Sequence, residues 1–166
     1  MGKLFPSTTP KITVGEIHPL YCWYGDVYLY NRKKYLIFTN SLTRVSLMIG
    51  PYSVDKKEHF SRTFALALKQ KLSTIIQDSD AYFEKIEGDG WIALPDKGAT
   101  AFVNRIKEEL NYLKEYWKAM DDKIMVLPED FNNTFLRNVT SIKGKYFYPE
   151  DKFVKEWEKY KSESIE

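Results

Sequence analysis

The feature that most constrains this chain is a change in its hydrophobic period near Gly50-Pro51. Before this point, short runs rich in Tyr and β-branched residues are separated by polar breaks, as is typical of strands. After it, apolar residues recur at three- and four-residue steps, as on one face of a helix. Strands that come first and helices that follow are typical of an α+β fold, which is the fold class that we predict.

Three short strands are predicted within residues 22–50. They cover Tyr24–Tyr30, Tyr35–Thr39 and Arg44–Ile49, and the breaks between them are only about four residues long. Connections this short favour an antiparallel meander. Because side chains alternate along a strand, Val45, Leu47 and Ile49 share one face, which we expect to pack against the helices.

The helical part of the chain is predicted to hold two main helices, and a third helix is predicted at the C-terminus. The main helices are expected to cover one face of the N-terminal three-stranded meander. Helices are predicted over Asp55–Ile75, Ala81–Ile86 and Thr100–Met120, and from Pro149 through Tyr160. Two further short strands are predicted at Trp91–Leu94 and Ile124–Leu127.

A length of 166 residues is typical of a single domain. We therefore predict a single domain over residues 1–166. It begins with an irregular, proline-containing arm at 1–20 and continues with the meander at 22–50. A mainly helical part at 55–120 and a C-terminal segment at 121–166 with the terminal helix complete it.

Composition and charge exclude several classes of protein. Aromatic residues make up 16% of the chain and the net charge is only +2, which argues against disorder. No run of 18 apolar residues could span a membrane, and no apolar leader follows Met1, so a cytoplasmic location is expected. Cys22 is the only cysteine, which excludes an internal disulfide and a cysteine-based zinc site.

Several short motifs together resemble an uncharacterised bacterial and plasmid-associated family of small domains of unknown function. The motifs are Trp23–Asp26, Asn31–Lys34 and Phe38–Asn40 in the strands, and Asn132–Thr134 and Lys145–Pro149 near the end. The resemblance touches most of the chain. It implies a fold and a place to look, because the family supplies no reaction.

The chain departs from the family pattern at two positions. Tyr24 stands where the family usually has His, and Asp26 stands where it has Asn. If that His carries out chemistry in the family, this member has lost it.

The candidate binding surface is the Tyr-rich first strand together with the basic turn that follows it. Asp26, Tyr28 and Tyr30 are expected on one face, opposite Val27 and Leu29. Such a face could stack bases and pair with phosphates. The alternative is that these tyrosines only reflect the preference of Tyr for strands, and that the basic turn is simply a solvated turn. The candidate residues are Tyr24, Asp26, Tyr28, Tyr30, Asn31, Arg32, Lys33, Lys34 and Arg44.

Other chemistry-bearing residues give weaker signals. His18 and His59 lack metal-ligand spacing, and a surface or capping role is expected for both. Cys22 is expected to be a buried, unreactive thiol. A set of acidic side chains could together hold Mg²⁺, but these residues lie in turns and at helix starts, where acidic capping residues are expected. Its members are Asp78, Asp80, Glu84, Glu87, Asp89 and Asp96. No catalytic residue, metal site or cofactor is predicted.

Three functions remain open on these observations. The first is a non-enzymatic, soluble binding or regulatory domain that contacts a protein partner through an aromatic-rich surface. The alternative is a nucleic-acid-associated accessory protein of a plasmid, phage or other mobile element, using the Tyr-rich sheet and residues 31–34. The third is a metal-assisted enzyme that uses the carboxylates.

Overall fold

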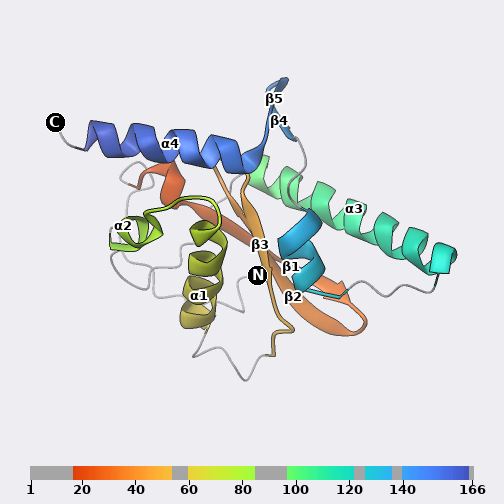
Figure 1. The fold of residues 1–166 in the computed structure, drawn as a ribbon. Helices are drawn as coiled ribbons and strands as arrows, with labels where there is room; N and C mark the ends of the chain where they lie inside the picture. Colours follow the sequence, from red (N-terminus) through yellow and green to blue (C-terminus); the bar gives the residue numbers. More distant parts are fainter. Residues whose placement is uncertain (1–16, 54–59, 85–96, 122–125, 136–139, 165–166) are drawn as a thin grey trace.

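A computed structural model describes residues 17–53, 60–84, 97–121, 126–135 and 140–164 (Figure 1). A three-stranded antiparallel sheet of order β1-β2-β3 forms its centre. β1 is Trp23–Tyr30, β2 is Lys33–Asn40 and β3 is Ser46–Ile49. The predicted meander is therefore confirmed, and its order before the helices makes the fold α+β.

Short turns fix the register of this sheet. Tyr30 pairs with Lys33, so only Asn31 and Arg32 form the β1–β2 turn. Both have positive φ, 47° and 61°, as a type I′ hairpin turn requires. Asn40 closes the other end of β2. Its Nδ2 donates to Leu20 O at 2.8 Å, and its Oδ1 accepts from Thr43 N at 3.0 Å, so this completely buried amide ties the N-terminal segment to the β2–β3 turn.

Helices follow the sheet largely where the apolar stripes predict them. α1 is Phe60–Ser73, α2 is Ser79–Glu84 and α3 is Lys97–Asp121. α4 is Pro149–Glu163, with Pro149 in its first turn and acidic residues beside it, as predicted. A single 3-10 turn, η2, covers Pro19–Tyr21, and a single π-helical turn, η4, covers Phe131–Phe135.

Some predictions lie outside the described residues. These are the start of the first helix at residues 55–59, the strand at Trp91–Leu94 and the end of the second helix beyond Glu84. The strand predicted at Ile124–Leu127 is wrong in its described half, because Val126 and Leu127 belong to a turn that leads into η4. The hairpin of β4, Thr140–Ile142, and β5, Lys145–Phe147, was not predicted.

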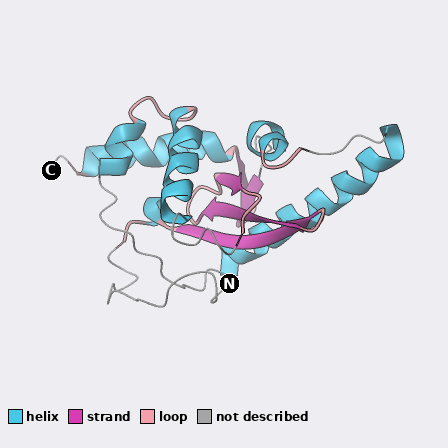
Figure 2. Cartoon of the chain, turned by 90° about the horizontal axis from the view of Figure 1, so that it is seen from below, coloured by secondary structure: helices cyan, strands magenta, loops and turns pink. Residues whose placement is uncertain are grey.

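The two main helices lie on opposite faces of the sheet (Figures 1 and 2). This corrects the expectation that both cover one face. Alternation along β2 explains the arrangement, because Leu36 and Phe38 point to one side while Tyr35 and Ile37 point to the other. All four are buried, so each face needs its own cover.

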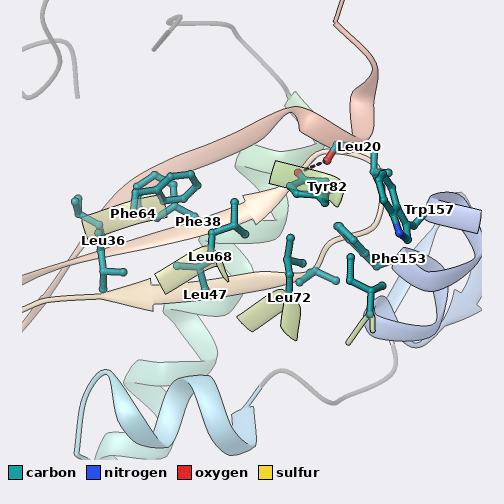
Figure 3. Packing of buried hydrophobic residues seen from close by; sticks show 13 residues of the cluster. Leu20, Leu36, Phe38, Leu47, Phe64, Leu68, Leu72, Tyr82, Phe153 and Trp157 are labelled. Carbon is teal, nitrogen blue, oxygen red and sulfur yellow. Dashed lines mark hydrogen bonds between the residues drawn. The ribbon is translucent and has the colours of Figure 1, made fainter. Parts of the chain in front are cut away.

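One face packs against α1, α2 and α4, and Figure 3 shows this cluster. Phe64, Leu68 and Leu72 of α1 meet Leu36, Phe38 and Leu47 of the sheet, which confirms that Leu47 is a core residue. Tyr82 of α2 donates its hydroxyl to Leu20 O at 2.9 Å, the dashed line in Figure 3. Phe153 and Trp157 of α4 close the cluster, and both are completely buried.

The other face packs against α3 and η4. Val103, Ile106 and Leu110 of α3 cover Tyr28, Tyr30, Ile37 and Met48, with Phe131 of η4 beside them. Asn132 fixes η4 to β3, since its Oδ1 accepts from Met48 N and its Nδ2 donates to Met48 O, both at 2.8 Å.

Candidate functional site

The Tyr-rich face of β1 is part of the core. Asp26, Tyr28 and Tyr30 do share one face, as predicted, but Tyr28 is only 4% exposed and Tyr30 only 6%. The Tyr28 hydroxyl donates to Asn111 Oδ1 on α3 at 3.0 Å, and burial raises the pKa of Tyr28. Rings covered by a helix offer no face to a base, so these two tyrosines do not form the stacking surface predicted for them.

Asp26 and Tyr24 also serve contacts within the molecule. Asp26 Oδ2 pairs with Lys107 Nζ on α3, and Asp26 Oδ1 accepts from Val27 N at 2.8 Å. Tyr24 is half-buried against the cluster under α3. The side chains of Tyr24 and Asp26 therefore both face α3.

The basic turn at residues 31–34 is exposed. Arg32, Lys33 and Lys34 have no carboxylate within ion-pair distance among the residues that the structure describes. The side chain opposite Lys34 on β1 is Leu29, which is apolar and exposed. The turn thus offers cations, but the tyrosines expected to accompany them are buried.

Arg44 lies away from this turn. It belongs to the β2–β3 connection, at the opposite end of β2, and its φ is 65°. It is 7% exposed, and its Nη1 donates to Ser41 O at 2.7 Å. Arg44 therefore does not join Arg32, Lys33 and Lys34 in one surface.

The remaining sequence candidates have structural roles where they are described. His18 caps η2, since its Nδ1 accepts from Leu20 N at 3.2 Å. Cys22 is half-buried and its Sγ lies 3.8 Å from His18 O. Asp80 pairs with Lys69 and Asp78 pairs with Lys161, and no metal-binding group of three or more acidic, His or Cys side chains occurs in the described part of the chain. His59, Glu87, Asp89 and Asp96 lie outside that part.

A basic and aromatic groove lies between the β4–β5 hairpin and the start of α4. We name it the hairpin groove. Its volume is about 560 Å³, and its lining holds four lysines and one carboxylate. Its lining consists of Ile142, Lys143, Lys145, Tyr146, Phe147, Tyr148, Asp151, Lys152 and Lys155.

Local sequence explains the hairpin wall of this groove. Ile142 pairs with Lys145, so Lys143 and Gly144 form a two-residue turn. Both have positive φ, 51° and 77°, and glycine at the second position adopts such a conformation without steric cost. Arg105 of α3 holds the base of β4, because its Nη2 donates to Thr140 Oγ1 at 2.8 Å.

The helix wall is held by the core and by α1. Phe153 and Trp157 anchor α4 in the core, and Glu150 in its first turn pairs with Lys71 of α1 at 3.1 Å. Lys152 and Lys155, three residues apart, share a side of α4 that lines the groove. The α4 wall of the groove is therefore anchored in the core of the molecule.

Lys152 is a partly buried lysine of the hairpin groove. Its Nζ lies 4.5 Å from the centre of the Phe147 ring. Partial burial lowers the pKa of Lys152, the negative charge of Glu156 opposes this shift, and the positive charge of Arg44 adds a smaller lowering. A partly desolvated ammonium group is stabilised when a further anion approaches it.

Two tyrosines stand on the rim of this groove with their rings in solvent. Tyr146 is 79% exposed and Tyr148 is 52% exposed. This site was not predicted from the sequence, although Lys145–Pro149 is one of the motifs that carry the family resemblance. The available signal was the turn-forming pair Lys143-Gly144, followed by Lys145, Tyr146 and Tyr148.

A family model matches residues 3–152 and is described as a domain of unknown function, DUF6933. The chain belongs to this family. This confirms the resemblance to a family of domains of unknown function, and the match includes the hairpin and the first turn of α4. No curated protein and no solved structure matches the chain. None of the described helices is both long and apolar enough to cross a membrane.

Proposed function

We propose that this protein is a non-enzymatic binding domain and that the hairpin groove is its binding surface for a negatively charged partner. The observation that supports this proposal is the gathering of four lysines with only one carboxylate around a groove of about 560 Å³. Four ammonium groups around one groove attract a negatively charged partner.

The proposed function is the non-enzymatic binding function expected first from the sequence, but its surface is the hairpin groove and not the Tyr-rich face of β1. A protein partner would have to present acidic side chains, since the groove combines cations with exposed tyrosine rings. A nucleic-acid partner would present phosphates to the same lysines.

The chain offers a matched pair of variants to test this. Lys143→Glu/Lys145→Glu reverses two exposed cations of the hairpin groove, and Lys33→Glu/Lys34→Glu makes the same charge change at the exposed β1–β2 hairpin. Binding of labelled polyglutamate and of a labelled oligonucleotide is measured by fluorescence anisotropy at low salt. We expect the groove variant to weaken binding by about tenfold or more, and the control to leave it largely unchanged.

The opposite ranking would contradict the proposal and assign binding to the basic turn. Absence of binding to every polyanion by the parent protein would contradict the binding function altogether. Urea unfolding checks that both variants remain folded, and we expect each to stay within about 0.5 kcal/mol of the parent because all four lysines are exposed.

A further inference from the structure

We infer that the ligand of the hairpin groove is a single strand of nucleic acid, whose phosphates contact the lysines and whose bases stack on Tyr146 and Tyr148. This inference rests on the proposed binding function, which it makes specific. It places the nucleic-acid contact on the C-terminal hairpin and α4, away from the Tyr-rich face of β1.

The cations come from both walls of the groove. Lys143 and Lys145 belong to the hairpin, and Lys152 and Lys155 belong to α4. A chain of phosphates that lies along the groove meets positive charge on each side. A positively charged groove that follows the backbone is the first element of sites that bind single strands without reading sequence.

The exposed rings supply the second element. Tyr146 lies on β5 and Tyr148 has extended backbone, with φ −87° and ψ 126°. Residues two apart in an extended segment point to the same side, so the two rings belong to one side of this segment, while Lys145 and Phe147 belong to the other. Base stacking on such rings is favourable and tolerates any sequence, because every base has a π face.

The rings also favour a single strand over the other polyanions. In a duplex the base faces are covered by neighbouring base pairs, and only unpaired bases can stack on a protein side chain. An acidic peptide would use the lysines but would gain little from two tyrosine rings that stand 79% and 52% exposed.

The test compares four labelled probes with the full chain at low salt: oligothymidylate and oligouridylate of about 15 nucleotides, a DNA duplex, and polyglutamate of similar charge. We expect the single strands to bind most tightly, with an affinity that falls steeply as salt is raised. Tyr146→Ala should weaken single-strand binding by about fivefold to 100-fold with little change in salt dependence. Lys145→Ala should instead reduce the slope of log affinity against log salt by about one unit.

Tyr112→Ala is the matched control, since Tyr112 on α3 is 73% exposed but lies outside the groove. It should bind like the parent, and Tyr146→Trp, which keeps a ring, should restore binding. Equal or tighter binding of polyglutamate or duplex, or an unchanged affinity in Tyr146→Ala, would overturn the inference while leaving the proposed binding function intact. Failure of all four probes to bind would overturn both.

Discussion

Asp78 joins α2 to α4 through two contacts of one carboxylate. Its Oδ2 accepts from Lys161 Nζ at 2.8 Å, and its Oδ1 accepts from Trp157 Nε1 at 2.9 Å. Hydrogen bonds from Lys161 and then Trp157 hold the pKa of Asp78 below its ordinary value of 3.8. Trp157 is completely buried, so its indole N–H has no ready replacement for this acceptor.

Replacing Asp78 should therefore destabilise the fold in a pH-dependent way. The pKa of Asp78 is lower in the folded state than in the unfolded state. Its contribution to the free energy of unfolding is thus fully present above the unfolded-state value of about 4 and is lost as the pH falls through the folded value. We expect Asp78→Asn to be less stable than the parent at neutral pH and the difference to shrink in acid, as measured by urea unfolding across the acidic range.

Asp80→Asn is the control for this experiment. Asp80 pairs with Lys69 but its side chain is largely exposed, so its removal should change stability by about 0.5 kcal/mol or less. A loss in Asp78→Asn that stays constant between neutral and acidic pH would show that the ionised carboxylate is not what joins the helices.

At the level of elements, the β1–β2 pair depends on a glycine under an aromatic ring. Gly25 lies opposite Phe38 in the register, and a methyl group at Gly25 would lie 2.7 Å from Phe38 Cδ1. The Phe38 ring also packs against Phe64, with 4.5 Å between the two ring centroids. This packing gives a physical reason for the small residue in the Trp23–Asp26 motif.

Gly25→Ala should destabilise the protein by about 1–3 kcal/mol, because neither the strand nor the packed ring can move aside freely. The measurement is the urea midpoint of unfolding. Gly98→Ala, at an exposed position in the first turn of α3, is the control and should be neutral or stabilising. If the two variants behaved alike, close packing of Phe38 on Gly25 would be wrong.

For the whole molecule, the decisive feature is a small sheet with both faces covered. Leu47 and Met48 are neighbours on β3, yet Leu47 belongs to the cluster under α1 and Met48 to the cluster under α3. Each is 1% exposed. The sheet is therefore the central layer, and the helices on its two sides do not share one core.

Leu47→Ala and Met48→Ala should each lower the free energy of unfolding by about 2–5 kcal/mol, because each leaves a cavity in a different cluster. Leu66→Ala on α1, where the side chain is 56% exposed, should stay within about 0.5 kcal/mol. Urea unfolding measures all three. A near-neutral Met48→Ala would support the one-faced sheet expected from the sequence.

The meander and the main helices could be predicted because their periods of two and 3.6 extend over enough residues to be distinguished. The burial of the second sheet face, under α3, could not be predicted, because a tyrosine in a strand is compatible with both solvent and the core. Tyr28 and Tyr30 carry hydroxyl groups that suggest a surface, and only the position of α3 decides their burial.

The hairpin groove escaped prediction for a different reason. Its strands are three residues long, too short to show a period. Its lysines also belong to a segment, residues 123–166, in which 8 basic and 8 acidic residues cancel. Net charge along the sequence could not reveal cations that gather only when α4 packs beside the hairpin.

Asn132 has a consequence for how this protein behaves among copies of itself. The outward main-chain groups of an outer strand are a template on which another polypeptide can add. At Met48 both groups are already occupied, because the Asn132 amide takes the place of a neighbouring strand. An added strand would have to displace these two hydrogen bonds before forming its own at Met48, so Asn132 of η4 hinders strand addition along β3.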